Sequence, residues 1–308
     1  MAFAAGSGGC RLINKLEFLL AVAREQNFRR AAEACGVAQP TLSAGIKQLE
    51  DTLGVMLVRR SSHFQGLTPE GERVLEWAKR LVSDARAMQE EIHSLRKGLS
   101  GGLRIAVIPT ALPYAPALTM LYRSLHPKVG ITILSRSSIE IMDMLGDLQA
   151  DAGITYLDNE NIGRLRSVPL YVERYRLLTT QAGPMGQRQH VTWAEVGALP
   201  LCLLTPDMQN RRILDRLMTG AGTASNPCML ESDSIVALIA HVRRGDWVTV
   251  VSEHVAEAMT GTGPFWSIPI TEPDATFRIG LVTPDRQPTS PMVSALIAAA
   301  ERLARQAV

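Results

Sequence analysis

One predicted helical face combines small, polar and basic side chains. Proline is favoured in the first turn of a helix, so a helix is expected to begin at about Gln39 or Pro40. Its apolar residues form one stripe, and they are Leu42, Ile46, Leu49 and Leu53. The opposite face carries Pro40, Ser43, Ala44, Lys47 and Gln48. Short side chains near a helix N-terminus allow the backbone to approach base edges in the major groove. The face therefore suits contact with DNA, and an ordinary three-helix bundle, which has the same stripe, is the alternative.

Hydroxyl side chains stand where predicted strands give way to predicted helices. The residues at these places are Thr110 and Ala111 after one strand, Ser137 and Ser138 after the next, and Thr205 and Pro206 after a later one. In open α/β sheets, ligands bind beyond the carboxyl ends of the strands, where helix N-termini favour anions. We expect a cleft there for a small anion such as a carboxylate. Each hydroxyl is equally compatible with an ordinary helix N-cap.

Motifs for catalysis or metal binding do not occur in the sequence. It has no G-x-S-x-G, no H-E-x-x-H, no Walker loop and no dinucleotide fingerprint, and its six histidines do not cluster. No pair of its four cysteines has metal-ligand spacing. We therefore expect neither an enzyme nor a resident cofactor or metal. The cysteines are interpreted as small buried side chains in a reducing compartment, and a redox-active pair, Cys202 with Cys228, is the alternative.

The residues before the polar face predict two further helices. Asn14 is a suitable N-cap for a helix to about Glu25, and Asn27 for a second helix from Phe28 to Cys35. Two short helices joined by a glycine-containing turn, here at Gly36, are typical of a helix-turn-helix.

A basic loop follows the helix-turn-helix. Val55, Leu57 and Leu67 indicate short strands on either side of a loop, and the loop carries Arg59, Arg60 and His63. Such a wing usually contacts phosphate and the minor groove, where arginine is favoured. The alternative is a solvated basic loop.

A long helix is predicted next. Thr68 is its cap, Pro69 occupies its first position, and no breaker occurs before Gly98. Apolar residues recur at spacings of four and three, and they are Val74, Ala78, Leu81, Ala85, Met88, Ile92 and Leu95. At 1.5 Å per residue the helix is about 43 Å long, and so narrow a seam needs a partner. We expect a dimer, which predicts a pseudo-palindromic DNA site; packing onto its own domain is the alternative.

The remaining two hundred residues alternate predicted strands with helices. After a Gly-Ser hinge at 99–102, strands are expected at 103–108, 130–135, 151–154, 174–180, 201–204, 228–231, 247–251 and 277–282. This alternation predicts a parallel sheet with right-handed crossovers. Because the region is large for one sheet, two Rossmann-like α/β subdomains separated by a cleft fit better.

Together, these motifs resemble the N-terminal domain of LysR-type transcriptional regulators. The resemblance rests on Ala31-Ala32, Gln39-Pro40-Thr41-Leu42-Ser43, Ile46-x-x-Leu49-Glu50, Leu53-Gly54-Val55, Arg60 and Leu67-Thr68-Pro69-x-Gly71. It implies that Gln39, Pro40, Thr41 and Ser43 face bases. It also implies that Arg29, Lys47 and Arg60 favour phosphates.

The C-terminal region resembles the effector-binding domain of the same family, which is similar to type 2 periplasmic binding proteins. The similar pieces are Leu103-Arg104-Ile105-Ala106, Ser138, Asp151-Ala152-Gly153-Ile154 and Arg244-Gly245. The resemblance implies a small-molecule effector in the cleft and a homotetramer of two dimers. RNA polymerase is a candidate further partner. The stretch from 134 to 160 resembles regulators linked to formate dehydrogenase operons.

The predicted organisation is a winged helix-turn-helix at 10–68, a linker helix at 69–98 and an effector-binding domain at 102–308. Within the last, subdomain I is expected at about 102–162 and 267–308, and subdomain II at about 163–266. The overall fold class is α/β. Residues 1–100 hold 14 Lys and Arg against 11 Asp and Glu, and the remainder holds 18 against 19, so the basic excess lies in the first third.

The location follows from what the sequence lacks. No apolar run approaches the ~20 residues that span a bilayer, and the N-terminus lacks a signal-peptide pattern. We therefore expect a bacterial cytoplasmic protein associated with the nucleoid and without a membrane partner. A transport-type solute-binding protein is the alternative of another class, and the missing leader disfavours it.

Overall fold

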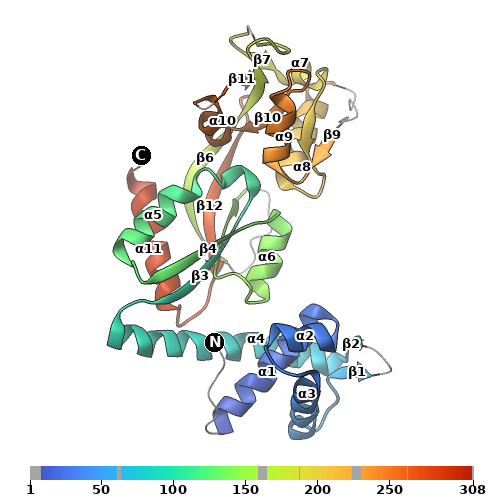
Figure 1. Cartoon of the computed structure of the whole chain (residues 1–308), viewed down its shortest axis with the longest axis vertical. Coiled ribbons are helices and arrows are strands. Elements are labelled where there is room, and N and C mark those ends of the chain that lie inside the picture. The colour runs from blue at the N-terminus through green and yellow to red at the C-terminus, as the bar shows by residue number, and fades with distance from the viewer. Residues whose placement is uncertain are drawn as a thin grey trace. The chain divides into compact units, whose positions relative to one another are not determined.

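The computed structural model describes residues 8–60, 64–158, 165–186, 188–223, 230–261 and 263–306. They form two compact units, which we take in turn (Figure 1). The first unit comprises the chain up to Leu99 together with the short segments 146–149 and 286–291, and the second comprises the rest. In these described ranges, no helix has both the length and the hydropathy needed to cross a bilayer.

Three helices form the core of the first unit, and they are α1 (Gly8–Glu25), α2 (Phe28–Ala34) and α3 (Gln39–Leu53). The predicted cap of α2 is confirmed, because Asn27 Oδ1 accepts hydrogen bonds from the backbone N–H groups of Arg29 (2.9 Å) and Arg30 (3.1 Å). The predicted start of α1 is wrong. The helix begins at Gly8, so Asn14 lies inside it and does not cap it.

Helix α3 has the predicted start, and three of the four residues of the predicted stripe, Leu42, Ile46 and Leu49, are fully buried. The fourth, Leu53, is exposed because it lies in the last turn, before Gly54 ends the helix in the left-handed conformation at φ +71°. Gly45 faces α1 so closely that a Cβ atom there would lie 2.6 Å from the Phe18 ring. The apolar face of α3 is therefore fixed against α1, and its polar face is left outside.

A two-stranded wing and a long helix complete this unit. Strands β1 (Val58–Arg60) and β2 (Phe64–Leu67) pair antiparallel, and helix α4 (Pro69–Lys97) follows. Thr68 caps α4 by accepting from the backbone N–H of Gly71 at 2.9 Å. A Cβ atom on Gly71 would lie 2.1 Å from the Leu57 carbonyl oxygen, so only glycine permits this approach of α4 to the wing.

The second unit has two lobes, of which the first contains a parallel sheet. Its strands β3 (Gly101–Val107), β4 (Val129–Ser135) and β5 (Ala152–Tyr156) run parallel, in the order β4-β3-β5. Their partners in this lobe are η1 (Pro109–Ala111), α5 (Ala115–Leu125), α6 (Ser138–Gly146) and α11 (Pro291–Gln306). Strand β5 extends beyond the predicted end at Ile154 to Tyr156.

Two strands pass from one lobe to the other (Figure 1). They are β6 (Leu165–Thr180) and β12 (Thr276–Pro284), which pair antiparallel, and β12 also pairs antiparallel with β5. The expected all-parallel sheet is therefore wrong here. A strand that returns from the other lobe is not held by a β-α-β crossover, so its direction is free to reverse.

The second lobe contains several short elements. They are β7 (Val191–Thr192), α7 (Trp193–Gly197), β8 (Cys202–Leu204), α8 (Gln209–Gly220), β9 (Leu230–Ser232), α9 (Ile235–Val242), β10 (Thr249–Ser252), α10 (Glu253–Thr260) and β11 (Phe265–Thr271). Sequence reasoning missed β7, α7, α10 and β11. Strands β10 and β11 pair with the distal half of β6, so the same sheet continues into this lobe. The overall class, α/β behind a winged helix-turn-helix, is confirmed.

Candidate functional site

The polar face of α3 is open to solvent. Gln39, Pro40, Thr41 and Lys47 are exposed, and Ser43 is half-buried. Because the opposite face is buried against the helical core, the whole polar face can lie along a groove of DNA without unfolding anything. The predicted set of base-facing residues therefore shares one accessible surface.

The predicted phosphate-contacting residues differ in their surroundings. Arg29 Nε pairs with Glu33 Oε1 at 3.1 Å, one turn along α2, although both side chains are largely exposed. The prediction that Arg59 and Arg60 lie in the loop is wrong, because β1 begins only at Val58 and extends through both residues; Arg59 is exposed on this strand. Arg60 belongs to the backbone of β1, but its side chain and the whole of His63 lie outside the described residues.

Sequence reasoning missed the residue that joins helix α3 to the wing. Glu50 is buried near the end of α3, and its Oε1 accepts hydrogen bonds from the backbone N–H groups of Leu57 (2.9 Å) and Val58 (3.2 Å). A carboxylate that satisfies two buried N–H groups holds the start of β1 at a fixed place. Its sequence signal was an acid in line with the apolar stripe, one residue after Leu49.

The predicted seam of α4 divides into two parts. Ala78 is buried in the helical core, and Val74 and Ala85 are half-buried. The larger seam residues remain exposed, with fractional exposures of 42% for Leu81, 57% for Met88, 56% for Ile92 and 78% for Leu95. The C-terminal half of α4 thus carries an apolar stripe that the described residues of this chain leave uncovered.

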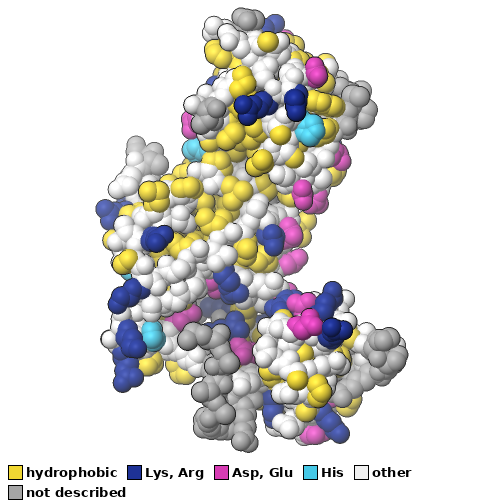
Figure 2. Space-filling model, in the orientation of Figure 1, with side chains coloured by type: hydrophobic (Ala, Val, Ile, Leu, Met, Phe, Trp, Pro, Cys, Tyr) yellow, Lys and Arg dark blue, Asp and Glu magenta, His cyan; other side chains and the backbone are white. Residues whose placement is uncertain are grey.

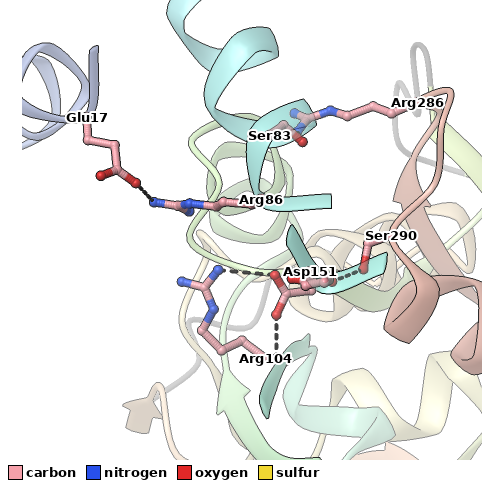
Figure 3. Close-up of polar contacts among 8 residues, drawn as sticks. Glu17, Ser83, Arg86, Arg104, Asp151, Arg286 and Ser290 are labelled. Atoms are coloured by element: carbon pink, nitrogen blue, oxygen red, sulfur yellow. Dashed lines mark hydrogen bonds and ion pairs between the residues drawn. The ribbon is translucent and has the colours of Figure 1, made fainter. Parts of the chain in front are cut away.

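Other faces of α4 are occupied by polar contacts within the first unit (Figure 3). Arg86 donates to Glu17 Oε1 of α1 at 2.7 Å. In the segment 286–291, Arg286 hydrogen-bonds Ser83, and Ser290 hydrogen-bonds Glu90. These contacts fix the rotation of α4 about its own axis and lie away from the exposed stripe.

A small cavity in the second unit collects three of the predicted effector residues. Thr110, which lies in η1, lines it together with Ser137 and Ser138, which lie at the start of α6. The other lining residues are Ile108, Pro109, Tyr156, Leu204, Met208, Gln209 and Asn210. The cavity volume is about 10 Å³, which accommodates about one water-sized molecule.

The other three predicted effector residues are not in the lining. Ala111 is buried beside it, Thr205 is half-buried and Pro206 is exposed. The reason is that α8 begins at Gln209, after a further turn, so Met208, Gln209 and Asn210 take the expected places of Thr205 and Pro206.

The lining hydroxyl groups already have partners of different kinds. Ser137 and Glu140 exchange hydrogen bonds through their side chains and backbone N–H groups, so Ser137 does act as an N-cap. Ser138 Oγ accepts from Thr155 at 3.0 Å and therefore keeps its own proton to donate. Asn210 is 4% exposed, its side chain lies near the Tyr175 hydroxyl, and its Nδ2 makes no hydrogen bond of regular geometry among the described residues.

Arg104 and Arg136 do not line the cavity, whereas Arg211 of α8 donates to the carbonyl oxygen of Leu204, a lining residue, at 3.0 Å. Arg104 is paired with Asp151, through its backbone N–H (2.7 Å) and its guanidinium (3.1 Å; Figure 3). Arg136 donates to the Ser135 carbonyl oxygen. The N-terminal turns of α6 and α8 both supply residues to the lining, and helix N-termini favour an anion.

A buried carboxyl group behind the cavity was also missed. Glu173, in β6, is 2% exposed, and its Oε1 accepts from the Tyr156 hydroxyl at 2.7 Å. The Tyr156 hydroxyl also lies 3.1 Å from that of Tyr175 and 3.5 Å from Thr110 Oγ1. Burial raises the pKa of Glu173 to about 7, and hydrogen bonds from the surrounding hydroxyls oppose that rise.

An oxidation trigger requires a thiol that solvent can reach, and Cys202 does not provide one. Its sulfur is fully buried in the core of the second lobe, 3.5 Å from the Val248 carbonyl oxygen. Cys35 is half-buried, and burial raises the pKa of its thiol. Cys228 lies outside the described residues. In the described part of the chain, no His, Cys, Asp and Glu side chains group in a way that could hold a metal ion.

Two protein families match the chain, one for each part described above. Residues 13–72 match the family described as bacterial regulatory helix-turn-helix protein, lysR family. Residues 96–305 match the LysR substrate binding domain.

Several relatives of this chain are named as regulators of genes induced by hydrogen peroxide. The hydrogen peroxide-inducible genes activator of Dickeya chrysanthemi is 32% identical over 194 residues, 62% of this chain and 63% of that protein. The chain thus matches less than two thirds of that relative's length. The dual regulator OxyR of Escherichia coli is 32% identical over 193 residues, 62% of this chain and 63% of that protein. A probable activator of the same name from Mycobacterium avium is 27% identical, with 87% of this chain and 86% of that protein covered.

Solved structures share the whole fold. Full-length OxyR from Pseudomonas aeruginosa, with a cysteine replaced by aspartate, superposes with a TM-score of 0.73 at 24% identity, covering 98% of this chain and 95% of that one. Full-length CbnR complexed with its target DNA superposes with a TM-score of 0.61 at 19% identity, covering 94% and 99%. At such identities the likeness concerns the fold alone. The two family matches, together covering nearly all of the winged helix-turn-helix and the two-lobed domain, show that the chain belongs to the LysR family of DNA-binding transcriptional regulators.

Proposed function

We propose that this protein regulates promoters by inserting α3 into the major groove of a pseudo-palindromic site. The observation that supports it is the arrangement of α3. Its apolar stripe is buried while Gln39, Thr41 and Lys47 remain exposed, and Glu50 ties its end to the wing. A helix presented in this way, beside a basic wing, is the geometry that reads base edges and phosphates together.

Salt-dependent DNA binding tests this proposal. The full-length protein should bind DNA upstream of its own or a neighbouring gene, with an affinity that falls linearly in log–log form as salt rises. Lys47→Gln should reduce the salt slope by about one, because one phosphate contact is lost. Lys128→Gln, an exposed lysine of the second unit, is the matched control and should leave the slope unchanged. Absence of salt-dependent binding would refute the proposal.

We further propose that α4 pairs with α4 of a second copy. The exposed stripe of Leu81, Met88, Ile92 and Leu95 supports this pairing, because an uncovered apolar seam at heptad spacing costs free energy in water. A two-fold dimer would carry two copies of α3 to the two halves of the site. Association of two dimers into a tetramer, contact with RNA polymerase and a cytoplasmic location are also proposals.

For the effector, we propose a small anion bound in the cavity. The Nδ2 of Asn210, the free proton of Ser138 and the N-terminal turns of α6 and α8 all favour an acceptor with negative charge. The cavity of about 10 Å³ holds about one water-sized molecule, so the proposal takes formate, the smallest carboxylate, and requires the lining to move apart when formate binds.

A thermal-shift series on the full-length protein tests the anion. Formate, acetate and chloride at equal ionic strength should raise the melting temperature by different amounts, and formate should raise it most. The reason is that a ligand that binds only the folded state stabilises it. Ser138→Ala should weaken the response by roughly tenfold in concentration, the equivalent of one hydrogen bond to a charged group. Ser94→Ala, on α4, is the matched control. No shift with any small carboxylate would exclude this class of effector.

A second trigger, cysteine oxidation, has support from the peroxide-related names of the relatives. The burial of Cys202 in the lobe core opposes it, since a buried thiol is a poor nucleophile. The test is the transcriptional response to hydrogen peroxide in Cys202→Ser and Cys228→Ser, with Cys35→Ser as control. An unchanged response in both variants removes this trigger.

A further inference from the structure

One hydroxyl group lies between the cavity and a buried carboxyl group. Tyr156 lines the cavity, and its hydroxyl donates to Glu173 Oε1 at 2.7 Å. Glu173 itself is not part of the lining. A ligand in the cavity can therefore influence Glu173 in two ways, through the hydrogen bond of Tyr156 and through electrostatic interaction across the protein interior.

Among the residues that the structure describes, none forms an ion pair with the Glu173 carboxyl group. Its surroundings are hydroxyl groups, with Tyr156 from β5, Tyr171 and Tyr175 from β6, and Thr110 from η1. Beyond them lie Phe277 of β12, whose ring packs on Tyr156 and Tyr175, and His254 of α10, whose ring packs on Tyr171. Glu173 Oε2 and the Tyr171 hydroxyl have no hydrogen-bond partner of regular geometry among the described residues.

The protonated form of Glu173 is accessible near neutral pH, because a buried carboxylate without a neighbouring cation is costly in free energy.

A tyrosine hydroxyl has one proton to donate. While Glu173 is ionised, that proton is held by the carboxylate. Once Glu173 is protonated, the carboxylic acid can donate to the Tyr156 oxygen, and the tyrosine proton is free to turn toward an acceptor in the cavity. An anion there would also repel an ionised Glu173 across a medium of low dielectric constant. Both effects favour binding of the anion to the protein in which Glu173 is protonated.

We propose that the cavity binds its anion together with a proton, which is taken up from solvent by Glu173, so that Tyr156 can donate to the anion. This inference rests on the proposed small-anion effector, and it adds how the site accommodates the negative charge of that effector. Glu173 is then a positioning residue, because it acts on the ligand through Tyr156 and does not touch it.

Calorimetry with sodium formate on the full-length protein tests the coupling. At pH 7, titrations in buffers of different ionisation enthalpy should report uptake of a fraction of a proton per formate bound. The dissociation constant should rise by about tenfold per pH unit above pH 7.5, since one proton then has to be added for each anion. Formate stays ionised throughout this range, so its own titration does not contribute.

Two variants assign the proton. Glu173→Gln keeps an oxygen that accepts from Tyr156 and should bind formate with the same affinity from pH 6 to 8.5. His254→Gln, which replaces the histidine of the surrounding shell, should retain the slope above pH 7.5; loss of the slope would assign the proton to His254 and overturn the proposal.

The outcomes separate the two hypotheses. If formate binds the unaltered protein with a flat pH profile and no proton uptake, the coupling is refuted while the small-anion site stands. If no small carboxylate binds at any pH, both fall together. The proton uptake by the unaltered protein decides the matter even if Glu173→Gln does not fold.

Discussion

Single buried carboxyl groups perform opposite tasks in the two units. Glu50 accepts from two backbone N–H groups, and these bonds stabilise its oxygen where it lies. Glu173 is surrounded by hydroxyl groups and aromatic rings, and burial raises its pKa to about 7. Glu50 accepts from backbone N–H groups and holds the start of β1, whereas Glu173 accepts from side-chain hydroxyl groups beside the cavity.

Glu173→Gln should therefore change how stability depends on pH. In the unaltered protein the pKa of Glu173 is raised from 4.5 in the unfolded chain to about 7 in the folded state, so the folded state holds the extra proton. The contribution of protonated Glu173 to the free energy of unfolding is complete below pH 4.5. About 3 kcal/mol of it is lost as the pH rises to about 7. The variant lacks this loss. Urea unfolding should show the difference in unfolding free energy growing between pH 5 and pH 8; a constant difference would contradict the assignment.

At the scale of elements, close approaches decide where the DNA-binding parts lie. The end of α3, the start of β1 and the start of α4 meet around the backbone of residues 56–58. Glu50 binds it from one side, and Thr68 Oγ1 donates to the Met56 carbonyl oxygen at 2.6 Å from another. The wing is thus attached to both helices by its backbone.

Glu50→Ala should destabilise the first unit by about 3 kcal/mol, because two buried N–H groups lose their acceptor. Glu50→Gln retains an oxygen acceptor and should cost about 1 kcal/mol. The measurement is chemical unfolding followed by circular dichroism, together with DNA affinity under native conditions. Equal effects of the two variants would show that the hydrogen bonds are not what holds the wing.

Gly71→Ala tests the close packing of the start of α4 against the backbone of Leu57. The added Cβ would lie 2.1 Å from the Leu57 carbonyl oxygen, which is backbone and has little room to move. We expect a loss of about 2 kcal/mol and weaker DNA binding. Gly220→Ala is the matched control, since nothing lies within 4 Å of its added Cβ and alanine favours helices. A neutral Gly71→Ala would mean that the start of α4 can shift.

At the scale of the whole molecule, uncovered apolar surface indicates which faces await a partner. The stripe on α4 is one such face. On the second unit, Met120 and Val236 are also largely exposed, and hydrophobic side chains gather on the face drawn in Figure 2. Isolated exposed hydrophobic residues are normal in soluble proteins, so the heptad spacing on α4, and not exposure alone, favours pairing.

Ile92→Glu should weaken self-association through α4. A dimer loses two buried isoleucine side chains, about 3 kcal/mol, which corresponds to a roughly hundredfold weaker dimer. Sedimentation velocity over a concentration series measures the effect, and the affinity for a full palindrome should fall with it. His93→Glu places the same charge on another face of α4 and is the control. Unchanged sedimentation of Ile92→Glu would exclude this seam as the contact.

The sequence by itself determined the elements that depend on neighbours in the chain. The Asn27 and Thr68 caps, the Pro40 start, the stripe of α3 and the heptads of α4 are local patterns, because capping and helical periodicity act over a few residues. The spacing of short motifs also sufficed for the family. Boundaries were less secure where a helix start lacked a side-chain cap, as at Met208, which moved the expected site residues from Thr205 and Pro206 to Gln209 and Asn210.

Only the tertiary structure decided which distant residues meet. Glu173 and Tyr156 are 17 residues apart and come together because β5 and β6 both pair with β12. The same strand reverses the sheet that local alternation predicted as parallel. Buried polar groups are chosen by what packs around them in space, which no local period records, so the cavity and the proton-binding group behind it became visible only in the folded chain.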